Sequence, residues 1–439
     1  MNRKLIYTAC CAVMLQIHGT AQGQTLRLTQ AGCREMALAH SEKIQQADNT
    51  LRQAGLDRQI ARSAFLPTLD ASASGTYMAP DMEMTGNTKL QMRGMYMAGI
   101  DLTLPLYTGG KIRTGYRLSK IGEETASEQL RMARMDVLAE ADNAYWTYIA
   151  VCRKVRMMQA YRRQMDSLYS QTQAAVEAGM ATENDLLRIE AKRTDIHYQL
   201  QKTESGADLC RLSLCQVTGA DFSTEFETAD TAITVTAPKA LTSDISGRPE
   251  LNLLEKQVAA GREQIRMTRA EMLPTLALTG NYMYYGRTFM KGVADLGDGT
   301  TIPFKQEFKD GLWIAMLSLK VPLFHWGTNH KKVDKARLDL RNHELELQRN
   351  SRLLSIEARQ AALNVQDGYR LIATAEKGLQ QADENLHVMQ ARYAESLSPL
   401  TDLLDAQSQW QQAHSNLIEA QTQYKIYETQ YLRSTGRLE

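Results

Sequence analysis

The sequence has little of three things that often reveal a protein's surroundings: surplus charge, paired cysteines and long apolar runs. Its net charge is +1 over 439 residues. The lack of a basic surplus argues against a nucleic-acid partner, and the lack of an acidic run argues against a disordered tail. Beyond the amino terminus, no apolar run approaches the roughly 18 residues of a transmembrane helix. If this chain spans a membrane, it must do so with strands.

Cysteines provide no disulfide framework. Cys10 and Cys11 lie in an amino-terminal apolar run whose context does not fit a lipoprotein cleavage site, so we expect no lipid anchor. The remaining four are Cys33, Cys152, Cys210 and Cys215. The last two would lie about 8 Å apart on one helix, which is too far for a disulfide.

The amino terminus has the pattern of a secretory signal. Arg3 and Lys4 precede an apolar run from Leu5 to Ile17, and small residues follow near Ala21 and Gly23. This order of basic, apolar and small residues predicts a signal peptide over residues 1–23, so the mature protein is expected to leave the cytoplasm.

Signals of catalysis are also scarce. Thr108-Gly109-Gly110-Lys111 lacks the spacing of a phosphate-binding loop, and the eight histidines are scattered without ligand spacing. No nucleophile lies near a recognisable base. We therefore predict no enzyme activity, no catalytic residue, no cofactor and no metal site.

Two pairs of strands are predicted from a two-residue alternation. Leu66-Pro67-Thr68-Leu69 opens one pair over residues 67–105, and Leu273-Pro274-Thr275-Leu276 opens the other over residues 274–322. In each strand, apolar side chains occupy one face and smaller or polar ones the other. Residues 78–94 and 286–311 are predicted as the loops between the strands.

Long helices follow each strand pair, and the whole pattern repeats. Apolar residues at alternating spacings of four and three continue past Gly110 and Gly327 for nearly 70 residues, which predicts coiled-coil rods of about 100 Å. Asp185-Leu186-Leu187 and Asp402-Leu403-Leu404 lie 217 positions apart, beside predicted hairpin turns near 179 and 396. Internal repeats of this kind define the organisation of a fold.

The predicted divisions follow from that repeat. The signal peptide is followed by a first repeat over residues 24–219 and a linker over residues 220–247, expected to hold extended pieces and short helices. A second repeat covers residues 248–436, with Pro249 in the first turn of its first helix.

Four strands cannot close a membrane barrel, because the smallest such barrels have about eight. Several chains would have to combine their strands. Aromatic residues near both ends of the strands favour a lipid setting, with Trp313 toward the loop end and Trp326 toward the helix end. The alternative is a water-soluble sheet buried on one side, although little else in the chain is apolar enough to cover it.

The repeated order of helix, Leu-Pro-x-Leu strand, second strand, long helix, turn and long helix resembles the TolC family of outer-membrane efflux proteins. Arg248-Pro249-Glu250-Leu251 is similar to the start of that family's second half. The resemblance implies a mixed α/β membrane protein of the Gram-negative outer membrane, reaching into the periplasm. Its homotrimer would combine a long-helix coiled-coil α-barrel with a 12-stranded transmembrane β-barrel, to which each chain gives four strands.

The resemblance also implies a function and a set of partners. The chain would be the passive exit duct of a tripartite efflux or type I secretion system, opened at its periplasmic tip. Its partners would be outer-membrane lipid, a periplasmic adaptor (a membrane fusion protein) and an inner-membrane pump. The alternative is a non-transporting periplasmic coiled-coil adaptor or scaffold protein.

Site residues follow from matching positions in the two turns. Asp402 and Asp405 match aspartates that line the narrow periplasmic mouth, while Tyr393 and Asp185 match a tyrosine and an acid that hold it closed. The tips that would dock an adaptor carry Gly179, Leu186, Leu187, Ser396, Leu403 and Leu404.

The second turn departs from the family pattern at two positions. Ser396 stands where the family commonly has glycine, and Ser398 stands where an arginine often joins the latch. Ser398 and Pro399 are instead predicted to be the N-cap and first residue of the following helix. These departures predict a closed state that is held either by a different set of contacts or more loosely.

Overall fold

The computed structural model describes residues 25–80, 82–84, 88–91, 93–228, 233–238, 240–295 and 300–438, so the predicted signal peptide lies outside it. The chain divides into two compact units. The first unit contains residues 1–48, 129–251 and 350–439, and the second contains residues 49–128 and 252–349. Each unit therefore draws on both halves of the sequence repeat.

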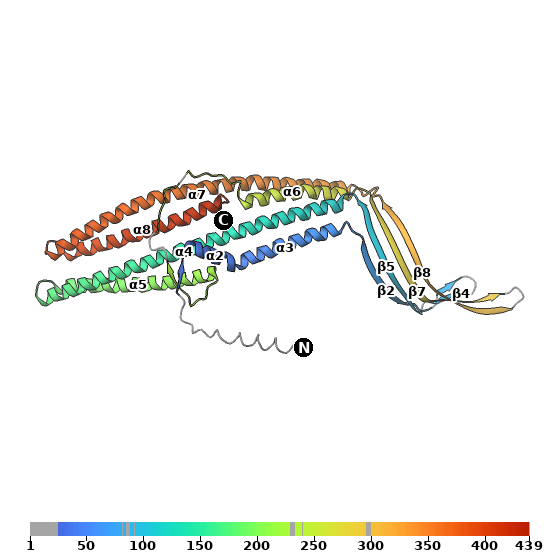
Figure 1. Ribbon diagram of the computed structural model, residues 1–439, viewed down its shortest axis with the longest axis horizontal. Coiled ribbons are helices and arrows are strands. Elements are labelled where there is room, and N and C mark those ends of the chain that lie inside the picture. Colours follow the sequence, from blue (N-terminus) through green and yellow to red (C-terminus); the bar gives the residue numbers. More distant parts are fainter. Residues whose placement is uncertain are drawn as a thin grey trace, which may run out of the picture. The chain divides into compact units, whose positions relative to one another are not determined.

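Long helices dominate the first unit. α4 (Lys111–Glu177) and α7 (Thr328–Ala394) have 67 residues each, which makes each about 100 Å long. Both contribute to the two units. Each is followed by an antiparallel partner, α5 (Glu183–Thr218) after α4 and α8 (Leu400–Ser434) after α7 (Figure 1). The 217-residue repeat is visible in these bounds, since α7 and α8 begin 217 positions after α4 and α5.

The predicted coiled-coil seam forms the core of this unit. Buried side chains recur at the alternating spacings of four and three that keep one face of a helix against its partner. On the two long helices they include Val137, Ala141, Tyr148, Met158, Met165, Ala358, Ala361, Val365, Ile372 and Leu386. Beyond the turns they continue with Ile189, Ile196, Leu200, Leu214, Leu403, Ala406, Tyr424 and Tyr431.

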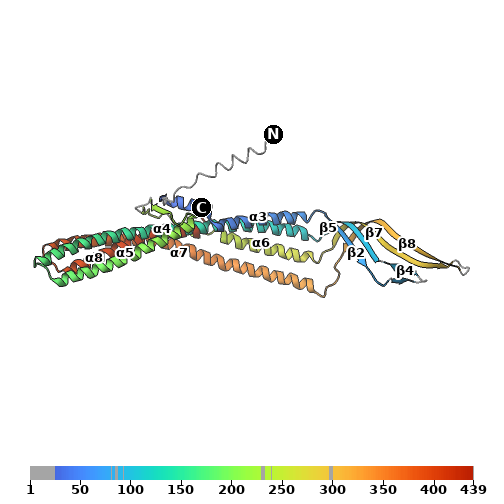
Figure 2. The same cartoon turned by 90° about the horizontal axis from the view of Figure 1, so that it is seen from below.

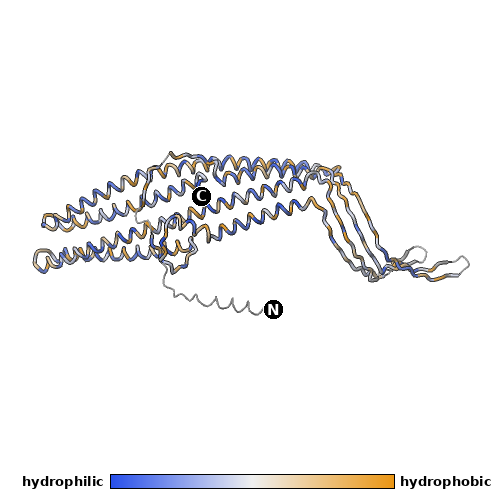
Figure 3. The backbone as a smooth tube through the Cα atoms, in the orientation of Figure 1, coloured by the Kyte–Doolittle hydropathy of each residue, from blue (hydrophilic) through white to orange (hydrophobic). Residues whose placement is uncertain are grey.

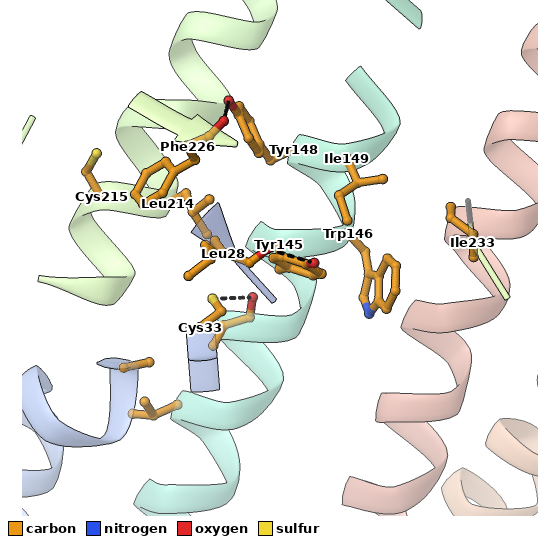
Figure 4. Packing of buried hydrophobic residues seen from close by; sticks show 13 residues of the cluster. Leu28, Cys33, Tyr145, Trp146, Tyr148, Ile149, Leu214, Cys215, Phe226 and Ile233 are labelled. Atoms are coloured by element: carbon orange, nitrogen blue, oxygen red, sulfur yellow. Dashed lines mark hydrogen bonds between the residues drawn. The ribbon is translucent and has the colours of Figure 1, made fainter. Parts of the chain in front are cut away.

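The amino-terminal segment pairs with the segment after α5 and packs on α4. β1 (Thr25–Leu28) pairs in parallel with β6 (Glu225–Thr228), and α2 (Gln30–His40) begins after Thr29, whose side chain accepts a hydrogen bond from the Gly32 backbone. Thr29 is thus the N-cap of α2. Figure 4 shows Cys33 and Tyr145 in this cluster, where the Cys33 thiol reaches the Ala141 carbonyl at 3.7 Å. Burial raises the pKa of Cys33 to about 12, with Asp142 adding to the rise and Arg34 opposing it.

A buried ion pair joins α2 to α4. The Arg34 guanidinium donates to both carboxylate oxygens of Asp142, at 2.8 and 2.5 Å, and Thr429 of α8 donates to the same carboxylate. The Asp142 side chain is only 1% exposed. A charge removed from water to this degree requires its partner, so the three elements are held in one geometry.

Both hairpin turns use the same backbone motif. The amide of Gly179 bonds to the Val176 carbonyl and that of Met180 to the Ala175 carbonyl, while Ser396 and Leu397 repeat this 217 positions later. These paired bonds define a Schellman motif, whose C′ residue must be left-handed. Gly179 has φ of 74° and Ser396 has φ of 59°. Serine therefore occupies a backbone conformation that favours glycine.

The second unit holds a sheet and the helices that lead into it. α3 (Glu42–Ser63) lies beside the start of α4, where Arg58 pairs with Glu123 at 3.0 Å. α6 (Pro249–Ala270) packs against the start of α7 through Ile265, Val333 and Ala336, as Figure 2 allows the reader to follow. α6 begins at Pro249, as predicted.

The sheet has six described strands. They are β2 (Thr68–Tyr77), β3 (Met82–Met84), β4 (Thr88–Gln91), β5 (Arg93–Thr108), β7 (Thr275–Asp295) and β8 (Thr301–Lys320). β2 pairs with β5, β5 with β7 and β7 with β8, all antiparallel. β3 and β4 form a short hairpin against the far end of β7. Within the described residues, β2 and β8 each have one unpaired edge.

The register separates the two sides of this sheet. Ala71, Ile100, Tyr282 and Trp313 lie in one cross-strand row, and we call their side the Trp313 face. The adjacent row contains Asp70, Asp101 and Asn281 and defines the Asn281 face. On the Trp313 face, Trp313, Leu317 and Leu319 are 78%, 62% and 63% exposed. One side of the sheet is therefore apolar and uncovered, as the alternation predicted.

Three sequence predictions differ from the structure. The segment 286–311 is largely strand rather than loop, and so is part of 78–94. A bulge near Arg287, whose φ is 60°, lets β7 continue past its expected end. The linker has β6 but no helix among its described residues. In the part of the chain that is described, no helix combines the length and apolarity needed to cross a membrane.

Removing Arg34 should be costly because it leaves Asp142 buried without its cation. We expect Arg34→Met to lower the free energy of unfolding by about 3 kcal/mol, and the double variant Arg34→Met/Asp142→Asn to recover part of the loss. The measurement is guanidinium titration of the purified protein. Arg337→Met is the control, because its pair with Asp334 is solvent-exposed and should cost less than about 0.5 kcal/mol. Equal losses for both single variants would contradict this account.

Replacing Ser396 by glycine should stabilise the second turn, because glycine adopts the left-handed backbone conformation without strain. We expect Ser396→Gly to raise the free energy of unfolding by about 0.5–1 kcal/mol, and Gly179→Ser to lower it by a similar amount. Amide hydrogen exchange at the two turns measures the local effect. A Ser396→Gly variant that exchanges faster than the parent would show that the serine side chain stabilises the turn.

Candidate functional site

The two hairpin turns border one cavity of about 830 Å³ in the first unit. Of the predicted site residues, Asp185, Tyr393, Ser396 and Leu403 line it. Helix residues supply much of the rest of the wall, including Gln164, Thr172, Gln390 and Gln407. Asp402, Asp405, Gly179, Leu186, Leu187 and Leu404 are not among its lining residues. The fold thus brings the predicted tyrosine and first-turn acid to one cavity and leaves the two second-turn acids outside it.

Asp185 is held within its own turn. The Thr182 hydroxyl accepts a hydrogen bond from the Asp185 amide at 3.2 Å and donates one to the Asp185 carboxylate at 2.6 Å. Thr182 is the N-cap of α5, so this reciprocal arrangement satisfies the start of the helix. Tyr393 lines the same cavity, but within one chain the bonded partner of Asp185 is Thr182.

The start of α8 lacks such a cap. Pro399 occupies the N-cap position that corresponds to Thr182, and no side chain caps the helix. The prediction of Ser398 as N-cap and Pro399 as first helical residue is therefore wrong by one position. A proline cannot cap with its side chain, which leaves Asp402 as the first-turn carboxylate facing the positive end of the helix dipole.

Asp402 and Asp405 are both exposed, and Thr401 donates a weak hydrogen bond to Asp402 at 3.4 Å. They lie one helical turn apart on α8 with Leu403 between them on the buried side. Two carboxylates on a solvent-facing stripe can attract cations without being fixed to any partner in this chain. Among the described residues, no group of three or more potential metal ligands comes together.

The predicted docking residues differ in accessibility. Leu187 is 58% exposed, whereas Leu403 is 2% exposed and packs in the core with Leu386, Leu400 and Ala406. Leu403 therefore fixes the position of the turn. Leu186 and Leu404 are partly buried, and Gly179 and Ser396 are exposed.

Two exposed apolar residues at the tips were not predicted from the sequence. Met180 and Leu397 follow the left-handed residues Gly179 and Ser396, and they are 80% and 69% exposed. They occupy equivalent positions 217 residues apart, so comparing the repeats position by position would have found them. Each tip thus ends in one large, uncovered apolar side chain.

Three buried oxygens in the cavity wall have no hydrogen-bond partner among the described residues: the Thr172 hydroxyl, the Ser398 hydroxyl and the Gln407 side-chain carbonyl. Thr172 and Gln407 are each 2% exposed. Buried polar atoms in native proteins nearly always have partners, so this wall is suited to receive water or a polar group from outside the chain.

Comparison with known proteins identifies the family. The family model for outer membrane efflux proteins matches residues 33–204 and 242–437. Outer membrane protein OprJ of Pseudomonas aeruginosa is 23% identical over 431 residues, which is 92% of this chain and 82% of OprJ. TolC of Salmonella enteritidis is 22% identical over 403 residues, covering 88% of this chain and 79% of TolC.

Solved structures show the same fold. A CusC crystal structure, studied for folding and transmembrane channel formation, matches with a TM-score of 0.78 at 15% identity and covers 96% of this chain and 95% of that one. The open state of the MtrE outer membrane channel of Neisseria gonorrhoeae has a TM-score of 0.76 at 19% identity, covering 93% of this chain and 89% of that one. The match spans both sequence repeats and leaves no support for a periplasmic adaptor or scaffold. This chain belongs to the outer membrane efflux protein family and is a channel protein of the outer membrane, not an enzyme.

Proposed function

We propose that three copies of this chain form the outer-membrane exit duct of a tripartite efflux or type I secretion system. The observation that carries the proposal is the sheet with an uncovered apolar face and unpaired edges at β2 and β8. An exposed edge is satisfied by pairing with another strand. Pairing β8 of one copy with β2 of the next would close a ring of 12 membrane strands and remove every edge.

The helical part would continue the duct into the periplasm. Each chain offers two antiparallel helix pairs with long coiled-coil seams, so three chains supply six pairs for one tunnel. Such a duct needs no energy source of its own. The inner-membrane pump would supply the energy and choose the substrate.

The turns would form the periplasmic mouth. Asp402 and Asp405 of three copies would place six carboxylates around one opening, which favours cations over anions. Tyr393 and Asp185 would take part in closing it. Because Asp185 is bonded to Thr182 within its turn, a closing contact from Tyr393 would have to share or replace that bond.

A periplasmic adaptor would dock on the cavity between the turns. Met180 and Leu397 offer uncovered apolar anchors, and the unpartnered oxygens of Thr172, Ser398 and Gln407 offer polar ones. Buried apolar anchors beside satisfied polar contacts are typical of the centre of a protein interface. Leu187 would extend this surface.

Planar-bilayer recording tests the duct itself. Purified protein added to one side should insert and give discrete conductance steps, and outer-membrane fractions should contain heat-modifiable trimers. A monomer that stays in the soluble periplasmic fraction and gives no conductance would rule the proposal out.

The mouth carboxylates have their own test in the same recordings. Asp402→Asn/Asp405→Asn should lower the ratio of cation to anion permeability severalfold, because six charges leave the opening. Asp334→Asn/Asp367→Asn is the matched control, since both residues lie exposed on α7 beside arginines. If the double variant at the turn kept the parent's selectivity, the mouth would lie elsewhere.

A further inference from the structure

The Trp313 face of the β7–β8 hairpin changes in character along its length. From Thr275 to Tyr285, most large apolar residues of β7 lie on the Trp313 face, opposite Trp313, Leu317 and Leu319 of β8, whereas Leu312, Ile314 and Met316 of β8 lie on the Asn281 face. The β7 residues on the Trp313 face include Leu276, Leu278 and Tyr282. The opposite, Asn281 face carries small and polar residues on β2 and β5, such as Ser72 and Asp101. This is the alternation of a sheet with lipid on one side and water on the other.

Beyond the bulge the Trp313 face of β8 changes from apolar to charged, while its Asn281 face keeps large apolar residues. Phe308, Phe304 and Ile302 of β8 lie on the Asn281 face, where Phe308 is opposite Thr288 and Phe304 opposite Gly292. Charged residues of this part of β8 take the other side, with Lys305, Glu307 and Lys309 on the Trp313 face. The faces are followed along β8, which has no bulge and therefore keeps its two-residue alternation from Trp313 to Ile302.

The short hairpin of β3 and β4 widens this apolar part of the Asn281 face. Leu90 lies opposite Met290 and Met82 opposite Leu90, which places all three on the Asn281 face. Figure 1 shows β4 beside the far parts of β7 and β8, and Figure 3 shows the mixed hydropathy along these segments. Met82 and Ile302 are each 50% exposed.

A row of lysines marks the other side as solvated. Lys89, Lys291 and Lys305 lie directly opposite one another on three neighbouring strands. Like charges in register repel, and they are tolerated where water screens them. The Lys305 ammonium lies 4.2 Å from the centre of the Phe289 ring, so it covers an aromatic residue on this side.

The two faces of the far part of the hairpin therefore suit different surroundings. In the far part of the hairpin, the Trp313 face is charged and suits water, while the Asn281 face is apolar, with Ile302 and Met82 half exposed and Phe304 and Phe308 partly buried. The Asn281 face is also the side that would line the inside of the barrel in the proposed trimer. Only the same faces of the other copies would lie across that interior.

We infer that the far ends of the β7–β8 hairpins from three copies pack together through Phe304, Phe308 and Ile302 and close the outer mouth of the duct. The inference rests on the proposed trimer and adds a second closure at the end away from the turns. Three apolar faces meeting on the threefold axis would bury their side chains from water, which is the ordinary stabilisation of a symmetric contact. Leu90 and Met82 would form the rim of the contact.

Single-cysteine crosslinking tests the inference in the full-length protein in isolated outer membranes. Phe304→Cys should give disulfide-linked chain pairs on mild oxidation, because its copies would meet near the axis. Lys305→Cys is the matched control: it is the next residue on the same strand but lies on the other face. The parent, whose cysteines at 33, 152, 210 and 215 are buried or partly buried, should give no crosslink.

The functional consequence can be read in the same variants. Oxidation should reduce the conductance of Phe304→Cys channels and reductant should restore it, while Lys305→Cys channels should not respond. Heat-modifiable trimers that conduct but give equal crosslinking at both positions, or none at position 304, would overturn the outer closure and leave the duct intact.

Two further outcomes are informative. Quenching of a Phe304→Trp variant by brominated lipid would show that lipid covers this face and would also overturn the inference. Absence of both trimers and conductance in the parent would instead refute the proposed duct, and the outer closure with it.

Discussion

A sheet with one bare apolar face and two unpaired edges is the constraint on which this protein depends. Trp313 and Leu317 are exposed because no element among the described residues covers them. The edges of β2 and β8 impose a second demand, since their backbone groups have partners on one side only. Both demands are met together if strands of neighbouring copies pair and lipid covers the apolar face. The isolated chain is therefore an incomplete structure, and its assembly completes the fold.

The internal repeat explains how one chain serves such an assembly. α4 and α7 have the same length, and their turns use the same Schellman geometry. In the proposed trimer, the two repeats of each chain would give six similar positions around a threefold axis. Differences between the two repeats would then make the first and second turns unequal around the axis. Thr182 caps α5 where Pro399 leaves α8 uncapped, and Gly179 is relaxed where Ser396 is strained. The second turn is thus the less stable of the two, which suits a part that moves.

Much of the fold could be predicted from periodicity, and the failures have physical causes. The long seams and the first part of each strand pair were recovered because a buried or apolar face continues through several turns or strand residues. The extension of β7 and β8 was missed because its Trp313 face changes from apolar to charged near Arg287, so the alternation of the membrane part does not continue along it. Ser398 was misread as a cap because the turn is one residue longer than the sequence suggested. The cavity between the turns, with its unpartnered oxygens, depends on packing between the two halves and has no sequence signature.

The central claim is that the working unit is a closed ring of three chains. Native mass spectrometry of the protein extracted from outer membranes in mild detergent measures this directly. A particle with the mass of three mature chains, which separates only when the sheet is unfolded by heating, is the predicted result. A particle with the mass of one chain, still carrying a folded sheet, would contradict the account.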